Sequence, residues 1–324
     1  MENIKDKLVF LKWQLLARLP RGSIYERVME SVLNNNLSDT NPFYYIYWLD
    51  INMSPLKKYL LGTFGTTNED YRQFINWLNK NYEKDGIYEI KVSNSIIKLP
   101  IPLFQDYKCF KAEFLDIIMP SITHNKDMSE PFLEGPYEYH DVTIKENDTV
   151  LDLGANFGLF SCLAASKHCE VYAFEPTKRI VEQYLNKLHN ISSNINVIEK
   201  AISNYTGSAM FQNFENNSSC NSLQVNNIKQ NANLVKVDTI TVDDFVSQHK
   251  LNKVDFIKAD IEGAERLMLE GAKETLKEFA PKLAICYYHK LDDLKVLRKL
   301  ILESNPNYKI DVNWKKIYAK VPKK

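Results

Sequence analysis

The pattern of apolar and polar residues changes along the chain, and its second half alternates between two periods. Short apolar runs, typical of buried strands, are separated by segments in which apolar residues recur every three or four positions, as in helices. Strands that alternate with helices form a parallel sheet with helices packed on both faces. The predicted strands are 149–153, 170–174, 196–199, 254–258 and 282–287, and the predicted helices are 158–166, 177–190, 263–279 and 292–303.

The closing stretch departs from this alternation. The segment YKIDVNWKKIYAKV (residues 308–321) reads as two adjacent strands joined by a short turn, so the parallel sheet is expected to finish in an antiparallel hairpin. Residues 211–234 are polar and rich in asparagine, which predicts a mobile surface loop between the third and fourth strands. The predicted fold class is therefore α/β, with a doubly wound, mostly parallel sheet.

The N-terminal third is expected to be mainly helical. Residues 3–82 have helical spacing and many aromatic side chains. Residues 87–100 alternate between apolar and polar on both sides of a Ser-Asn pair, which predicts a β-hairpin. Residues 106–119 again have helical spacing, and Pro120 is expected to end that helix.

A polar stretch near residue 125 is interpreted as a linker between two parts of the chain. We predict an N-terminal region, residues 1–125, that binds substrate or a partner or has an accessory role, and a catalytic domain at residues 126–324. Two interpretations remain open for the apolar and basic segment at residues 8–19. It forms either a helix docked on the rest of the chain or an amphipathic helix that contacts a membrane surface or a partner.

Composition narrows the class of protein. The chain of 324 residues has 41 basic and 41 acidic residues, so it lacks the positive charge typical of nucleic-acid-binding proteins. Its five cysteines include no CxxC pair, which favours reduced thiols in a cytoplasmic protein over disulfides or a zinc site. No apolar run reaches the length of about 20 residues that spans a bilayer, and the N-terminus does not resemble a signal peptide.

The segment VLDLGANFGLF (residues 150–160) joins the first predicted strand to a helix through a glycine turn. Such a turn lets a dinucleotide or S-adenosylmethionine (SAM) approach the backbone. A dinucleotide site requires G-x-G-x-x-G, but Asn156 stands at the middle position, preceded by Ala155. Asp152 would repel a pyrophosphate and suits a cationic amino group. A tight turn without any ligand remains the structural alternative.

Three further groups of polar residues follow predicted strands. Glu175 comes about 20 residues after the glycines, the spacing at which a carboxylate binds ribose hydroxyls. Asp260 is the first acidic residue after the fourth predicted strand and is expected to be functional. Glu262 and Glu265 are equally well explained as acidic residues in the first turn of the next helix. His289 follows the fifth strand and is expected within reach of Asp260, where a histidine is able to take a proton.

Together these residues resemble the FkbM family of class I SAM-dependent methyltransferases. The resemblance covers residues 134–321 and rests on the following segments: EGPYEYHDVTIKENDTVLDLGANFGLFS, VYAFEP, IEKAISNYTG, VDFIKADIEGAE and YYHKLDDLKVL. It implies a Rossmann-like, seven-stranded sheet whose last strand is antiparallel. Its family members methylate hydroxyl groups of secondary metabolites and sugars, so a small-molecule or glycan acceptor is expected.

The resemblance also implies roles for residues around SAM. The methionine end would be surrounded by Asp152, Gly154, Ala155, Asn156 and Gly158, and the ribose would be bound by Glu175. The adenine would lie against Ala201 and Ile202, which follow the third strand. The cofactor would be covered by Tyr137 and Glu138, which precede the first strand.

Methyl transfer to a hydroxyl needs orientation and a group that accepts the proton. Asp260 and His289 are the candidates, acting singly or together, and two potential ligands are too few to predict a metal site. Two other classes remain as alternatives: an NAD-dependent Rossmann oxidoreductase and a non-catalytic scaffold with the methyltransferase fold.

Overall fold

The residues described by the computed structural model are 68–92, 95–122, 136–214, 221–223, 233–313 and 315–322. The predicted helix that includes residues 8–19 and the predicted boundary near residue 125 lie outside them. Among the described helices, none is long and apolar enough to cross a membrane.

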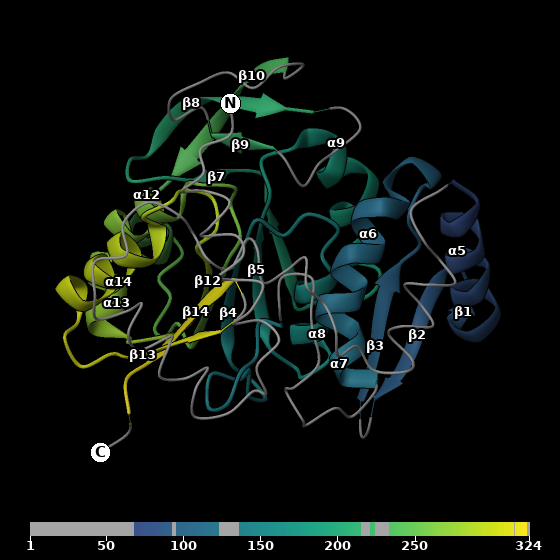
Figure 1. The fold of residues 1–324 in the computed structure, drawn as a ribbon, viewed down its shortest axis with the longest axis horizontal. Coiled ribbons are helices and arrows are strands. Elements are labelled where there is room, and N and C mark those ends of the chain that lie inside the picture. The colour runs from purple at the N-terminus through teal and green to yellow at the C-terminus, as the bar shows by residue number, and fades with distance from the viewer. Residues whose placement is uncertain are drawn as a thin grey trace, which may run out of the picture.

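A seven-stranded sheet forms the centre of the described chain (Figure 1). In spatial order its strands are β13 (Lys309–Asn313), β14 (Lys316–Lys320), β12 (Lys282–Cys286), β11 (Phe256–Ala259), β4 (Thr149–Leu153), β5 (Glu170–Phe174) and β6 (Ile195–Ile198). The five strands from β12 to β6 pair in parallel, whereas β14 runs antiparallel to both of its neighbours. The predicted doubly wound sheet and its C-terminal hairpin are confirmed.

Helices cover both faces of this sheet. One face carries α8 (Leu159–Ala165), α9 (Lys178–Ile180), η4 (Val181–Leu185) and α10 (Asn186–Leu188); the other carries α11 (Val242–Gln248), α12 (Glu265–Glu270), α13 (Lys273–Glu278) and α14 (Asp293–Ser304). Successive residues of β4 point to opposite faces, so Val150 and Leu151 belong to different apolar clusters. The helix predicted at 263–279 is two helices separated by Gly271, where a Cβ would lie 2.5 Å from the Ser203 carbonyl oxygen.

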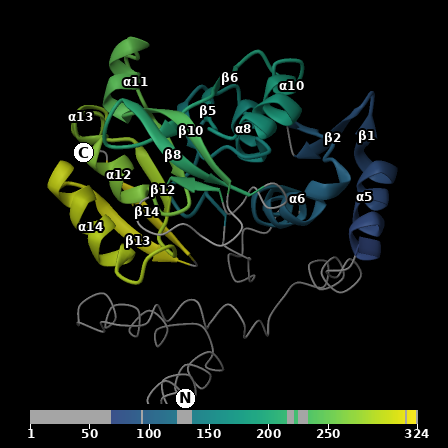
Figure 2. The ribbon, with the colours of Figure 1, turned by 90° about the horizontal axis from the view of Figure 1, so that it is seen from above.

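Residues 68–122 form a smaller unit beside the sheet (Figure 2). Its elements are α5 (Asn68–Tyr82), β1 (Glu83–Lys84), β2 (Ile87–Val92), β3 (Ser95–Pro100), η2 (Phe104–Asp106), α6 (Tyr107–Glu113), η3 (Phe114–Ile118) and α7 (Met119–Ile122). Antiparallel pairing of β2 with β3 confirms the predicted hairpin. The predicted helix end at Pro120 is wrong, because Pro120 lies within α7. It follows a π-helical turn, where backbone bonding is already irregular and a missing N–H is tolerated.

The smaller unit docks on the large one through aromatic rings and a buried ion pair. The ring of Phe110 in α6 lies 5.9 Å from that of Phe157, centroid to centroid. Asp106, only 4% exposed, accepts two 3.0 Å hydrogen bonds from the Arg179 guanidinium and one of 2.6 Å from the Tyr184 hydroxyl. These contacts hold α6 on the face of the sheet that carries α8 and η4.

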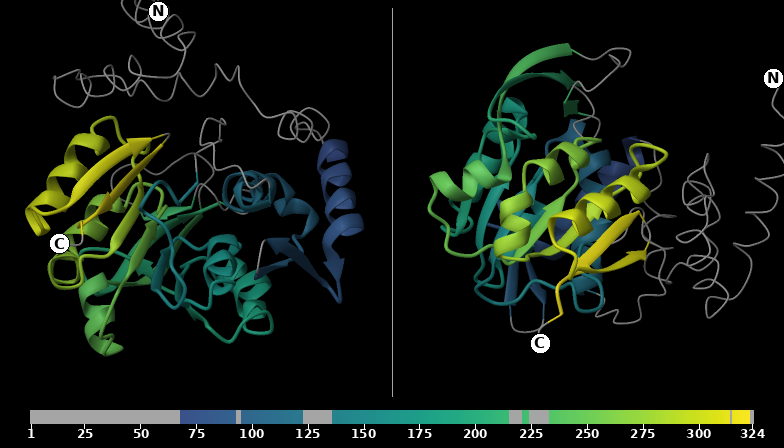
Figure 3. Two further views of the ribbon diagram at one scale, coloured as in Figure 1. Left: turned by 90° about the horizontal axis from the view of Figure 1, so that it is seen from below. Right: turned by 90° about the vertical axis from the view of Figure 1, so that its left-hand side faces the viewer.

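A second sheet projects beyond the first (Figure 3). It contains, in spatial order, β7 (Ala201–Ile202), β10 (Asn233–Ile240), β8 (Gly207–Asn213) and β9 (Ser222–Leu223). The prediction of a loop from residue 211 onward is wrong at both ends, because β8 and β10 pair antiparallel from Asn213–Asn233 to Gly207–Thr239. Each strand has only two buried residues, and these are adjacent, so both strands lack the apolar alternation that identifies a half-buried strand. The predicted mobility of this segment stays a prediction.

Candidate active site

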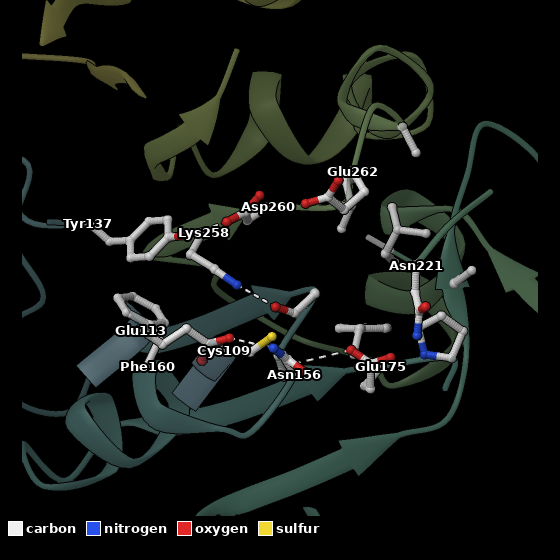
Figure 4. A pocket seen from close by; sticks show the side chains of 18 of the residues that line it. Cys109, Glu113, Tyr137, Asn156, Phe160, Glu175, Asn221, Lys258, Asp260 and Glu262 are labelled. Atoms are coloured by element: carbon white, nitrogen blue, oxygen red, sulfur yellow. Dashed lines mark hydrogen bonds between the residues drawn. The ribbon is translucent and has the colours of Figure 1, made fainter. Parts of the chain in front are cut away.

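A cavity of about 440 Å³ lies at the carboxyl ends of β4, β5 and β11 (Figure 4). Ligands of open α/β sheets bind at this edge. The wall combines α6 and η3 of the smaller unit, the turns that follow the three strands, and parts of the second sheet. The cavity is lined by these residues of the predicted site: Tyr137, Gly154, Ala155, Asn156, Glu175, Ala201, Ile202 and Asp260.

The turn after β4 brings its backbone close to β11. Gly154 has φ +77°, and a Cβ there would lie 2.0 Å from the Asp260 carbonyl oxygen, so only glycine fits. The N–H groups of Gly154 and Ala155 donate to the Phe174 carbonyl oxygen at 3.0 and 2.9 Å. The N–H of Asn156 donates to Oε2 of Glu175 at 3.1 Å. The turn's N–H groups are therefore satisfied within the protein.

Gly158, predicted to contact the cofactor, does not line the cavity. It begins α8 with φ +78°, and a Cβ there would lie 2.4 Å from Cδ1 of Leu188. The residue therefore allows close packing of α8 against α10.

Asp152 also lies behind the cavity wall and not in it. Its carboxylate is fully buried, 3.0 Å from Nζ of Lys258, and accepts a 2.6 Å hydrogen bond from the Ser161 hydroxyl. Burial alone would lower the pKa of Lys258, but Asp152 and the nearby carboxylates of Asp260 and Glu113 outweigh it and raise the pKa. The charge of Asp152 is thus balanced by Lys258, which lines the cavity and also donates to the Gly154 carbonyl oxygen.

Glu175 follows β5 at the wall of the cavity. It is 7% exposed and accepts hydrogen bonds from the backbone N–H groups of Thr177, at 2.9 Å, and Asn156. Burial raises the pKa of Glu175 despite these hydrogen bonds. Beside it, Oδ1 of Asn156 is buried without a hydrogen-bond partner among the described residues. The cavity therefore offers a fixed carboxylate and an open acceptor next to each other.

Asp260, immediately after β11, is held by two tyrosines. Its Oδ2 accepts a 2.7 Å hydrogen bond from the Tyr137 hydroxyl and its Oδ1 one of 3.2 Å from Tyr288. Burial alone would raise the pKa of Asp260, but Lys258, His289 and Lys316 outweigh it and lower the pKa. Asp260 is therefore ionised at neutral pH.

Glu138, predicted beside Tyr137 to close over the cofactor, lies away from this cavity. Its carboxylate accepts hydrogen bonds from Nζ of Lys167, at 2.8 and 2.9 Å, and from the Ile144 N–H at 2.7 Å. Successive residues of an extended segment point to opposite sides, so only Tyr137 of the pair faces Asp260.

His289 lies near Asp260, as predicted, but outside the cavity lining. Its Nε2 is 4.0 Å from Oδ1 of Asp260 and 3.5 Å from Oε2 of Glu262, and its Nδ1 is 3.3 Å from Oε1 of Glu265. Burial alone would lower the pKa of His289, but Glu265 and Glu262 outweigh it and hold the pKa well above its usual value. In this state the ring is protonated and does not serve as a general base.

Among the cavity residues that the sequence analysis missed, Glu113 and Lys258 are charged and contact predicted residues. Glu113 of α6 belongs to no recognisable motif and comes from the smaller unit, yet its carboxyl group accepts a hydrogen bond from the Asn156 side chain. Burial raises the pKa of Glu113 to about 8. Lys258 carried a usable signal, since a lysine inside an apolar, central strand needs a buried partner.

Comparison with known proteins finds methyltransferases. Residues 152–310 match the family model of the methyltransferase FkbM domain. A curated relative, the hexuronic acid methyltransferase AglP of Haloferax volcanii, is 23% identical over 160 residues, which are 49% of this chain and 64% of that protein.

Solved structures were compared as well. The methyltransferase FkbM from Methylobacillus flagellatus KT has a TM-score of 0.44 and 20% identity, over 86% of this chain and 65% of the other. A SAM-dependent methyltransferase from Aquifex aeolicus has a TM-score of 0.31 and 19% identity, over 56% and 86% of the two chains. This chain thus spans just under two thirds of the curated relative and of the FkbM structure. Residues 152–310, just under half of the chain, thus match the FkbM methyltransferase domain.

Proposed function

We propose that this protein is a SAM-dependent methyltransferase that methylates an oxygen atom of a sugar or glycan. The observation that carries the proposal is the pairing of the glycine turn with Glu175, whose carboxylate is fixed in the cavity wall by two backbone N–H groups. Carboxylates at the tip of the second strand bind ribose hydroxyls in this fold class. The sugar acceptor is supported by the name of the relative from Haloferax volcanii.

The residues of the cavity fit SAM. Its volume lies within the range of small-molecule sites. Glu175 would bind the ribose hydroxyls, and Ala201 and Ile202 would lie against the adenine. The unpaired acceptor Oδ1 of Asn156 and a carboxyl oxygen of Glu113 would receive the cationic amino group. When bound, SAM supplies a methyl group on a positively charged sulfur.

The same turn disfavours a dinucleotide. Pyrophosphate binds to free backbone N–H groups at the start of a helix. Here the N–H groups of Gly154, Ala155 and Asn156 already donate to Phe174 and Glu175. Among the acidic residues of the wall, the carboxylates of Glu175, Asp260 and Glu262 would also repel a diphosphate.

The chain's own residues contribute orientation and a proton acceptor. An in-line displacement depends strongly on alignment, which the rigid turn after β4 and the helix α6 would supply. We assign acceptance of the hydroxyl proton to Asp260, because it is ionised, lines the cavity and is oriented by Tyr137 and Tyr288. His289 would act through Asp260.

Calorimetric titration with SAM and with NAD tests the cofactor. We expect SAM to bind and NAD to give no measurable heat. Glu175→Ala should weaken SAM binding by about 1.5–3 kcal/mol, the range for hydrogen bonds to a charged group. The matched control is Glu182→Gln, an exposed residue of η4, which should leave affinity unchanged. NAD binding without a response to SAM would contradict the proposal.

The acceptor is tested by transfer of labelled methyl groups from SAM to a panel of neutral sugars, hexuronic acids and their glycosides. Mass spectrometry of the products then locates the methylated atom. The non-catalytic scaffold would be favoured if the protein bound SAM but transferred no methyl group to any sugar, and if Asp260→Asn did not change this result.

A further inference from the structure

His289 combines two properties that rarely occur together in a satisfied core histidine. Its side chain is only 9% exposed, and neither ring nitrogen has a hydrogen-bond partner among the described residues. Buried polar groups are almost always paired, so an unpaired buried imidazole requires an explanation. The surrounding carboxylate oxygens lie at 3.3–4.0 Å, in positions that do not complete hydrogen bonds.

The free Nε2 points toward two carboxylates at the rim of the cavity. Oδ1 of Asp260, Oε2 of Glu262 and a nitrogen of His289 belong to a group of ligand atoms that all lie within 4.8 Å of one another. Two oxygens and one imidazole nitrogen at this spacing would contact a central cation after small rotations of the side chains, since metal–ligand distances are about 2.0–2.2 Å. Figure 4 shows Asp260 and Glu262 side by side at this rim.

A further carboxylate lies on the other side of the ring. Glu265, 1% exposed, is fixed by the Ile261 N–H at 3.0 Å and lies 3.3 Å from Nδ1 of His289. Histidines that bind metals characteristically direct their second nitrogen at a carboxylate, which sets the tautomer and orients the ring. Glu265 is placed to hold a proton on Nδ1, so that the lone pair of Nε2 becomes available to a cation that displaces the second proton.

The backbone supports the same reading. Glu262 has φ +52°, a left-handed conformation that disfavours a residue with a Cβ. Glycine would fit this position without strain, and Gly263 next to it has φ +97°. Strained non-glycine residues cluster at functional sites, and here the strained backbone of Glu262 directs its carboxylate into the cavity wall.

We propose that Asp260, Glu262 and His289 bind a divalent metal ion at the rim of the cavity. Two carboxylates and one imidazole suit a cation such as Mn²⁺, which accepts oxygen and nitrogen ligands together. Asp260 and Glu262 line the cavity, so the remaining coordination positions would face it. A metal there would bind an acceptor hydroxyl and lower its pKa. This last role rests on the proposed methyl transfer, whereas the metal site itself does not.

A second cluster around the ring, formed by Glu265, His289 and Asp293, is a weaker candidate. Asp293 already accepts a 2.7 Å hydrogen bond from Nε of Arg266 and one of the same length from the Lys290 N–H. The arginine supplies the positive charge that a metal would bring, so the cation belongs on the Nε2 side of His289.

The test is to titrate Mn²⁺ into the full chain after treatment with a chelator. Electron paramagnetic resonance measures the free Mn²⁺, and calorimetry measures the heat of binding. The wild type should bind one Mn²⁺ per chain. Glu262→Gln and His289→Ala should weaken binding at least tenfold, and Glu265→Gln by about 10–100-fold, as for other residues that orient ligands. Glu270→Gln, at the exposed end of α12, is the matched control and should bind Mn²⁺ as the wild type does.

Glu262→Gly guards against effects on folding. It relieves the left-handed strain, so its thermal midpoint should equal or exceed that of the wild type while Mn²⁺ binding is lost. The proposal would be overturned if the wild type bound none of Mn²⁺, Mg²⁺ and Zn²⁺ stoichiometrically, or if Glu262→Gln and Glu262→Gly bound Mn²⁺ with the affinity of the wild type. SAM titration of the same samples separates the two proposals: metal binding without SAM binding rejects only the function.

Discussion

Glu113 shows how burial of a single residue couples folding to pH. Its pKa of about 8 keeps the carboxyl group protonated in the folded chain, whereas in the unfolded chain it ionises near the usual value of 4.5. Between these two values the unfolded state binds fewer protons than the folded state. Stability should therefore decrease as pH rises from 4.5 to about 8.

Glu113→Gln should remove this loss, because an amide does not ionise and keeps an acceptor for Asn156. We expect the variant to gain stability over the wild type by more than about 1.4 kcal/mol, the equivalent of one pKa unit, between pH 5 and pH 8.5. Urea unfolding at both pH values measures the difference. Glu278→Gln, on the exposed side of α13, should show the same pH dependence as the wild type. If the difference in unfolding free energy between Glu113→Gln and the wild type were the same at both pH values, a raised pKa of Glu113 would be refuted.

At the scale of elements, the turn between β4 and α8 is fixed by the approach of β11. Gly154 and Gly86 both have positive φ, +77° and +81°, but a Cβ would meet the Asp260 carbonyl oxygen at 2.0 Å only at Gly154. Gly86→Ala should lose about 1–2 kcal/mol through backbone strain alone. Gly154→Ala should lose a further 1–3 kcal/mol, roughly, through overpacking. Urea unfolding of both variants checks this, and equal losses would show that β11 yields freely.

The elements also show what a sequence can reveal. Strands β4 and β5 are predicted residue for residue, because buried parallel strands read as apolar runs bounded by turns. The glycine turn and Glu175 are found because their contacts are local. Strands β8 and β10 are missed by the sequence analysis, because their buried and exposed residues do not alternate. Glu113 reaches the cavity only through the docking of α6, which no local pattern encodes.

At the scale of the whole molecule, the cavity is built by two parts of the chain. Residues 152–310 carry the family match, whereas α6 and η3 lie outside it and close the opposite wall with Cys109, Glu113 and Asp116. Asp106 and Arg179 join the two parts by an ion pair in which the carboxylate is almost fully buried. A ligand in the cavity would contact both parts and therefore couple their stabilities.

Hydrogen exchange measures this coupling. Addition of SAM should slow amide exchange in α6 and η3, residues 107–118, as well as in the turn after β4, because ligand binding stabilises every element that forms the wall. Helix α14 is the internal control, since none of its residues lines the cavity, and its change should be small. Arg179→Leu should diminish the protection of α6 more than that of the turn, because it removes the ion pair with Asp106. Protection confined to residues 152–310 would show that the smaller unit takes no part in binding SAM.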